Sequence, residues 1–173
     1  MSLVTEHLDE RGVAFQVIPH RRAFTSLQEA RELGVAADEV LKTVGLRSAG
    51  KYVLAVVPAS RRLERRRVRE LLEDPGVRLA SEAELAADFP GHELGALPPL
   101  GSLLGVPMLV DPEVLDHGLV VFAAGTETES VRVAAAELFW DEPLAVLPLT
   151  RRDEPASQDP ISRCHDLARP SAS

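Results

Sequence analysis

Apolar and polar residues follow two different periods along the first 150 residues. Alternating positions, or short apolar runs bounded by turn residues, are typical of β-strands. The chain has these patterns at residues 14–18, 39–46, 51–57, 106–110, 119–124 and 145–147. Because residues 48–50 form a turn signal, we expect segments 39–46 and 51–57 to pair as an antiparallel hairpin.

Helices are indicated by apolar residues at three- and four-residue spacing and by capping signals. We expect helices at residues 3–12, 26–34 and 63–72, a short one starting at 81, and one entered from a strand within 131–139. Ser26 with Glu29, and Ser81 with Glu84, have the spacing of capping boxes. Residues 91–105 contain four glycines and two prolines, so no regular helix is expected there.

Interleaved strands and helices predict an α/β fold of the α+β type, built as a single domain over residues 1–150. Residues 151–173 are rich in Arg, Asp, Glu, Pro and Ser and lack apolar periodicity. This composition predicts a polar, flexible C-terminal tail. It contains the single Cys164 and also His165.

The formal charge of −8 argues against a general nucleic-acid binder, which must neutralise phosphates. The distribution is uneven, however, because six arginines fall within residues 61–69. This strip is either the solvated face of a helix or a local site for the phosphate-rich end of a partner. Only two of the 19 basic residues are lysines, Lys42 and Lys51. A compact ammonium has a tunable pKa that a guanidinium lacks, so Lys42, within a strand, draws attention.

Several classes of protein are disfavoured by the sequence. One cysteine excludes an internal disulfide and a cysteine-rich zinc site, and the five histidines are scattered without ligand spacing. We therefore expect no metal and no cofactor. The chain has no apolar run of about 18 residues, as a membrane span needs, and no apolar secretion signal at its start. These features favour a cytoplasmic protein with no membrane partner.

Three segments could carry chemistry. They are Lys42-Thr43 in a strand, the loop Gly95–Gly101, and Ala123-Ala124-Gly125-Thr126 at the end of an apolar strand. Glycines let a backbone approach a ligand closely, and backbone amides can stabilise an oxyanion. Each segment also has a plain structural interpretation, either a strand lysine reaching solvent or a tight turn.

Taken in order, these segments resemble the YbaK/prolyl-tRNA-synthetase-associated domain family, whose members are trans-editing aminoacyl-tRNA deacylases. The resemblance covers about residues 3–147. It rests on Pro19-His20 with Phe24-Thr25 and Glu29-Ala30, on Val40–Thr43, on Leu54–Pro58 with the helix to Leu72, on Gly95–Gly101 with Val106-Pro107 and Asp111, and on Phe122–Thr126.

The resemblance implies one domain with a curved, mixed, largely antiparallel sheet wrapped by helices. It also implies hydrolysis of the ester between a small mischarged amino acid and the 3′ end of tRNA. Lys42 would then be catalytic, close to the substrate carbonyl or the terminal phosphate, and the backbone around Gly101 and Ala124-Gly125 would orient the ester. The remaining substrate-binding positions by resemblance are His20, Phe24, Thr25, Thr43, Gly95, Pro99, Leu100, Ala123 and Thr126. The implied partners are the tRNA acceptor end and an aminoacyl-tRNA synthetase.

At two positions the sequence departs from the family pattern, so functions other than deacylation stay open. Some branches of the family have Asn where this chain has Thr43, and prolyl-editing branches often have His where this chain has Glu127. Together with Glu129, Glu127 would repel phosphate. A non-catalytic relative that binds a small amino-acid-like or nucleotide ligand is therefore the alternative, and the arginine strip with the tail also allows an interaction module.

Overall fold

The computed structural model describes residues 2–151. The predicted tail therefore lies outside the described residues, apart from Arg151. The helices are α1 (Leu3–Glu10), α2 (Ser26–Leu33), α3 (Arg65–Leu71), α4 (Glu82–Asp88), α5 (Gly101–Leu104) and α6 (Ala135–Leu138), with 3₁₀ turns at Ala37–Glu39 and Pro112–Asp116. The strands are β1 (Phe15–Pro19), β2 (Leu41–Ser48), β3 (Lys51–Pro58), β4 (Arg78–Leu79), β5 (Met108–Val110), β6 (Leu119–Ala123), β7 (Glu129–Ala134) and β8 (Leu144–Val146).

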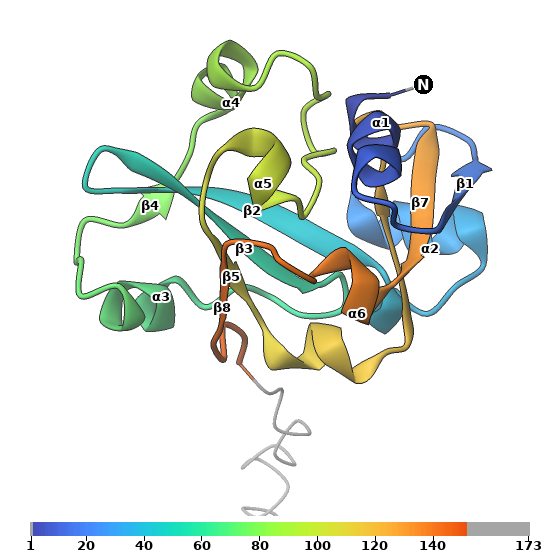
Figure 1. The fold of residues 1–173 in the computed structure, drawn as a ribbon. Coiled ribbons are helices and arrows are strands. Elements are labelled where there is room, and N and C mark those ends of the chain that lie inside the picture. The colour runs from blue at the N-terminus through green and yellow to red at the C-terminus, as the bar shows by residue number, and fades with distance from the viewer. Residues whose placement is uncertain (1, 152–173) are drawn as a thin grey trace, which may run out of the picture.

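The strands form two sheets, ordered β1-β7-β6 and β4-β2-β3-β5-β8 (Figure 1). The first is antiparallel, and the second is mixed because β5 pairs in parallel with β3 and with β8. The sheets meet at a parallel bridge between Val40 and Val121. The prediction of a mixed, largely antiparallel α/β domain is thus confirmed, although the sheet is divided in two.

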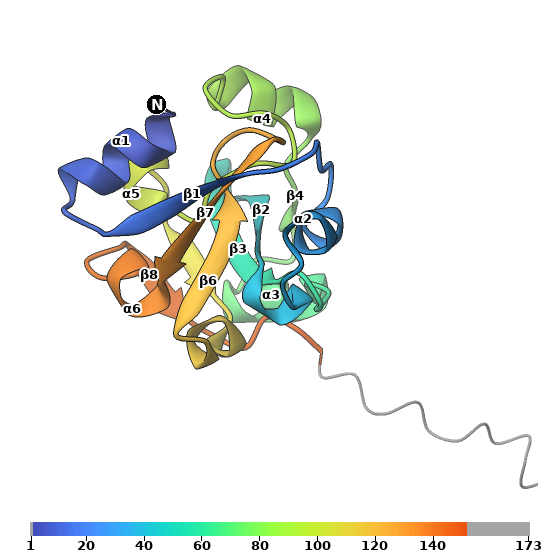
Figure 2. The same ribbon diagram turned by 90° about the vertical axis from the view of Figure 1, so that its right-hand side faces the viewer.

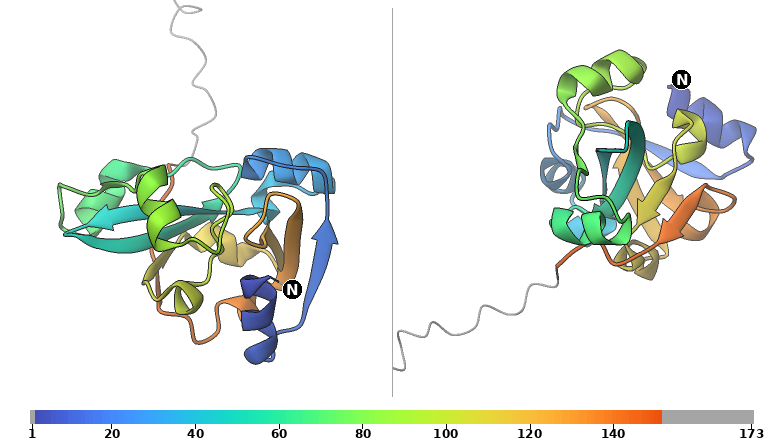
Figure 3. Two further views of the ribbon diagram at one scale, coloured as in Figure 1. Left: turned by 90° about the horizontal axis from the view of Figure 1, so that it is seen from above. Right: turned by 90° about the vertical axis from the view of Figure 1, so that its left-hand side faces the viewer.

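The predicted hairpin is confirmed and is the longest strand pairing among the described residues, from Leu41 opposite Pro58 to Ser48 opposite Lys51. Figure 3 shows it running away from the three-stranded sheet. β2 begins two residues later than predicted because residues 37–39 form a 3₁₀ turn. The short strand β4, which pairs with β2, was not predicted, since two residues have no readable period. The expectation of no regular helix within residues 91–105 is wrong at one turn, because α5 occupies Gly101–Leu104 between the last proline of the loop and Gly105.

Two of the helix starts test the capping signals. Ser81 and Glu84 form both bonds of a capping box at the start of α4, as predicted. At α2 the prediction is wrong by one residue, because the N-cap is Thr25, whose hydroxyl accepts a hydrogen bond from the amide of Gln28. Glu29 is therefore free to turn inward, and it is buried.

Three apolar clusters position the remaining elements. The main core lies between the two sheets and under α1, with Leu8, Val56 and Phe122 among its fully buried residues. A second cluster lies on the other face of the five-stranded sheet, where α3 contributes Val68. A third lies under α2, beside the bridge between the sheets. Figure 2 shows the three-stranded sheet side by side with α2.

Candidate functional site

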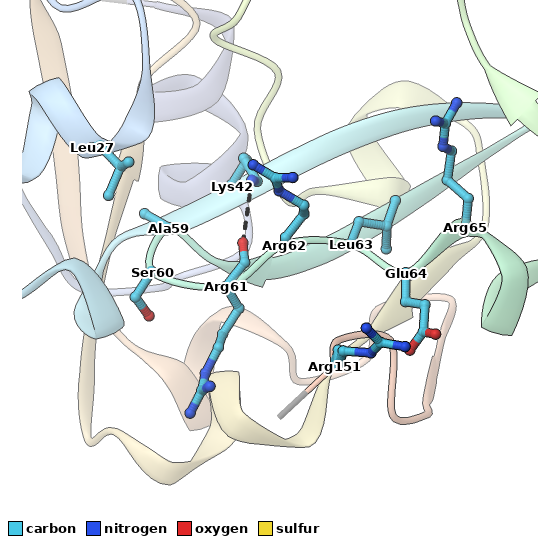
Figure 4. Close-up of a pocket in the computed structure, with 10 residues that line it drawn as sticks. All are labelled: Leu27, Lys42, Ala59, Ser60, Arg61, Arg62, Leu63, Glu64, Arg65 and Arg151. Atoms are coloured by element: carbon cyan, nitrogen blue, oxygen red, sulfur yellow. Dashed lines mark hydrogen bonds between the residues drawn. The ribbon is translucent and has the colours of Figure 1, made fainter. Parts of the chain in front are cut away.

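Lys42 lies near the start of β2, opposite Val57 of β3. Its side chain is half-buried, and the ammonium donates a hydrogen bond of 3.3 Å to the carbonyl oxygen of Arg61 (Figure 4). Burial lowers the pKa of Lys42 below its usual value, and the positive charge of Arg62 lowers it further. This ammonium is therefore poorly hydrated and faces another cation.

Lys42 lines a groove of about 780 Å³, which we call the cationic groove. Its wall is polar for the most part and includes backbone or side-chain atoms of five basic residues. They are Lys42, Arg61, Arg62, Arg65 and Arg151. The other lining residues are Leu27, Ala59, Ser60, Leu63 and Glu64. The groove thus runs from α2, past the end of β3, to the start of α3.

Thr43 and the Gly95–Gly101 loop lie on the other face of the sheet. Side chains alternate along a strand, so Thr43 points away from the face of Lys42. Gly45 shares the face of Thr43, and a Cβ built there would lie 3.6 Å from a methyl group of Leu97. The Thr43 hydroxyl is buried and has no hydrogen-bond partner among the described residues. The structure therefore separates two neighbours that the resemblance places in one site.

The glycines of the Gly95–Gly101 loop are explained by packing within the protein, without a ligand. Gly95 has φ +81°, and a Cβ there would lie 3.2 Å from the carbonyl oxygen of Phe24. A Cβ on Gly101 would lie 2.4 Å from the carbonyl oxygen of Val106. The Gly101 amide, a predicted oxyanion donor, donates to the sulfur of Met108 at 3.2 Å, which is a weak acceptor. Pro99 and Leu100 are buried.

The segment Ala123–Thr126 begins at the last residue of β6. Like the Gly95–Gly101 loop, it makes contacts with other parts of the protein that account for its composition. The Ala124 amide donates to the carbonyl oxygen of Glu129 at 2.9 Å, so it is not free for an oxyanion. Gly125 has φ +86°, and a Cβ there would lie 3.1 Å from Nδ1 of His92. This Nδ1 is buried without a partner among the described residues, and burial lowers the pKa of His92. His92 is a polar group near this loop that the sequence analysis did not select.

Thr126 lines a second hollow, of about 550 Å³, beside α1 and β1. Its hydroxyl, like that of Thr43, is buried without a partner among the described residues. Phe24 and Thr25 are exposed at the start of α2. Lys42 thus lines the cationic groove and Thr126 the second hollow, while the other predicted site residues line neither. The roles assigned to all of them remain predictions.

His20 is held by the protein itself. Its Nδ1 lies 2.6 Å from the carbonyl oxygen of Arg21 and its Nε2 lies 2.8 Å from the hydroxyl of Ser130. The same hydroxyl donates to the carboxyl group of Glu29. Ser130 and Glu29 are both buried. Burial raises the pKa of Glu29, while the bond from Ser130 and the charge of His20 oppose this rise.

Sequence reasoning missed this cluster because Glu29 was assigned to a capping box. A usable signal was present: an acidic residue next to Ala30, on the side of the helix that faces the sheet. The cluster joins the loop before α2 to the first residues of β7. Backbone bonds from His20 to Thr128 and from Ala23 to Glu127 add to this connection.

Glu127, whose charge argued against phosphate binding, is partly neutralised. Its carboxylate lies 3.4 Å from the guanidinium of Arg22. Its backbone amide donates to the carboxylate of Glu93 at 2.7 Å, which brings another negative charge to the loop. The ion pair with Arg22 thus offsets the charge of Glu127, but the loop after β6 remains acidic.

The family model of the aminoacyl-tRNA editing domain matches residues 20–139, which is more than half of the chain. The chain belongs to the aminoacyl-tRNA editing domain family. The match runs from His20 to Phe139 and contains Lys42, both glycine-containing loops and the cationic groove except Arg151.

Individual relatives agree with this editing-domain assignment. The chain is 28% identical over 134 residues to a proline–tRNA ligase of Fervidobacterium nodosum, which covers 76% of this chain and 23% of the ligase. The chain thus spans less than a quarter of that relative's length. A solved structure described as a proposed trans-editing enzyme for prolyl-tRNA synthetase has a TM-score of 0.77 at 23% identity, covering 87% of this chain and 96% of that one. The hypothetical protein APE2540 has a TM-score of 0.74 at 26% identity, covering 84% and 98%.

Within residues 2–151 of this editing domain, no helix combines the length and apolar character needed to cross a bilayer. In the same range, no three His, Cys, Asp or Glu side chains are grouped as metal ligands would be.

Proposed function

We propose that this editing domain is an aminoacyl-tRNA deacylase. It hydrolyses the ester between a small mischarged amino acid and the 3′-terminal ribose of tRNA. The observation that carries the proposal is Lys42, a half-buried ammonium at the wall of a groove large enough for a nucleotide. The family match supplies the substrate class.

Hydrolysis of an aminoacyl ester requires few catalytic groups from the protein. An aminoacyl ester is already activated, so a water held in line and a stabilised oxyanion are sufficient. A fixed cation in a partly desolvated position stabilises developing negative charge more strongly than one in bulk water. Lys42 supplies such a charge. The substrate's own vicinal ribose hydroxyl can orient the attacking water.

The relatives favour tRNA charged by prolyl-tRNA synthetase. One is a proline–tRNA ligase and another is described as acting in trans for that synthetase. The synthetase is therefore the partner we propose, in the cytoplasm. No cofactor or metal takes part in the proposed reaction.

The deciding experiment is single-turnover deacylation of tRNA(Pro) carrying labelled Ala, Ser, Cys or Pro. We expect one amino acid to be released rapidly. Lys42→Ala should slow that release about 100-fold or more, the usual loss when one oxyanion-stabilising group is removed. Lys51→Ala is the matched control, because Lys51 is exposed at the far end of the hairpin, and it should react at the wild-type rate.

Two outcomes would contradict the proposal. Equal rates for Lys42→Ala and wild type would remove Lys42 from the mechanism. No release above the spontaneous rate, together with stoichiometric binding of the charged tRNA, would favour the non-catalytic, ligand-binding alternative.

A further inference from the structure

The cationic groove gathers several positive charges that have no ion-pair partner within residues 2–151. Among residues 2–151, the ion pairs within 4.0 Å involve neither Lys42 nor Arg62, Arg65 or Arg151. Arg61 differs from these four, because its guanidinium lies 3.1 Å from Glu113, and Figure 4 shows its side chain directed away from Lys42.

The protein has 27 acidic residues against 19 basic ones, so carboxylates are plentiful. Among residues 2–151, seven arginines take part in ion pairs, whereas Arg21, Arg31, Arg69 and Arg132 lack one just as Arg62, Arg65 and Arg151 do. The groove differs in bringing three such arginines together with Lys42 along one wall. Glu64 is the single carboxylate among the groove's lining residues, and its oxygen lies 3.9 Å from Nε of Arg67.

A concave surface that collects unpaired cations produces a local positive potential even on an acidic protein. The guanidinium group suits this use, since its planar fork of donors matches a phosphate and stays charged. The three apolar lining residues, Leu27, Ala59 and Leu63, are too few to form a pocket for an amino-acid side chain. The groove is thus shaped for an anion.

We propose that the cationic groove binds the phosphodiester backbone of the single-stranded 3′ end of an RNA. In this assignment Arg62 and Arg65 contact phosphates that precede the nucleotide next to Lys42. The identity of the anion as RNA rests on the proposed function, while the existence of an anion site rests on the unpaired charges. It follows that the amino-acid side chain is recognised elsewhere than in this groove.

The test compares substitution of arginines inside the groove with substitution of an exposed arginine outside it. The double variant Arg62→Gln/Arg65→Gln removes two charges from the groove, and Arg65→Gln removes one. Arg66→Gln is the charge-matched control for Arg65→Gln, because Arg66 belongs to the same helix as Arg65, is 85% exposed and is paired with Glu70. All three side chains are exposed, so these variants should fold, and circular dichroism and thermal melting verify this.

The first readout is binding of an uncharged, labelled acceptor-stem oligonucleotide with a single-stranded 3′ end, measured against salt concentration. This readout requires no catalysis, so it is independent of whether deacylation occurs. The double variant should bind about tenfold more weakly. The slope of log K against log salt should fall by about 1.4, or about 0.7 for each phosphate contact to a single strand. Arg66→Gln should bind as wild type does.

The second readout is kinetic. The double variant should raise KM for charged tRNA more strongly than KM for an aminoacyl-adenosine, which has no preceding phosphates.

Three results would overturn the assignment. The first is wild-type binding by the double variant. The second is equal losses for Arg66→Gln and Arg65→Gln, which would indicate diffuse attraction. The third is an affinity for AMP as high as that for the oligonucleotide, which would identify a nucleotide pocket instead.

Discussion

Nε2 of His20 lies 2.8 Å from the hydroxyl of Ser130, although the two residues are 110 positions apart in the chain. Nδ1 of the same ring lies 2.6 Å from the carbonyl oxygen of Arg21, and the Ser130 hydroxyl also donates to the carboxyl group of Glu29. These contacts attach the loop before α2 to β7.

Removing the central hydroxyl should weaken the fold. Ser130→Ala leaves the buried Glu29 carboxyl group without its hydrogen-bond donor, and the free energy of unfolding should fall by about 1–3 kcal/mol. Urea denaturation measures this change. Thr128→Ala removes an exposed hydroxyl two residues away and should have little effect. Equal stabilities for Ser130→Ala and wild type would show that the cluster contributes nothing.

Glu29 should also give the protein a characteristic pH dependence. Burial raises the pKa of Glu29 in the folded state, so folding favours the protonated form. Its contribution to stability is fully present below the ordinary pKa of 4.5 and is lost as pH rises through that value toward the raised one. Glu29→Gln cannot ionise. The stability of wild type relative to this variant, measured by urea denaturation between about pH 4 and pH 8, should therefore decrease with rising pH. Parallel stability curves would contradict the assignment.

Gly101 distinguishes a packing role from a catalytic one. A Cβ at this position would lie 2.4 Å from a backbone oxygen, and backbone cannot move aside cheaply. Gly101→Ala should cost about 1–3 kcal/mol of unfolding free energy, as overpacking usually does, and thermal melting measures it. Gly118→Ala is the control, because a Cβ there has nothing within 4 Å. If Gly101→Ala keeps full stability but loses deacylation, the oxyanion role predicted from the resemblance is favoured instead.

Two substitutions at the start of α2 test whether Thr25 is its N-cap. Thr25→Ala removes the hydroxyl that accepts from the Gln28 amide and should reduce stability by about 1 kcal/mol. Ser26 is the first helical residue and not the cap, so Ser26→Ala should change stability much less. The reverse order of the two effects in denaturant titrations would restore the capping box that the sequence predicts.

Much of the local structure could be predicted from the sequence, although this prediction missed β4 and placed the cap of α2 one residue late. Alternation and a turn signal were sufficient for the β2–β3 hairpin, the spacing of Ser81 and Glu84 for a capping box, and the ordered motifs for the family. These signals lie within a few residues of one another, or recur in a fixed order, so they can be read without knowing how the chain folds back.

Tertiary structure alone decided which side chains meet. Strand alternation already puts Lys42 and Thr43 on opposite faces, but only the folded chain shows that the face of Lys42 meets the arginines of residues 61–65 rather than the glycine loop. The partner of Glu29 is a serine 101 residues away, and no local pattern points to it. Burial and long-range pairing depend on how the two sheets pack, and that packing is a property of the whole folded chain.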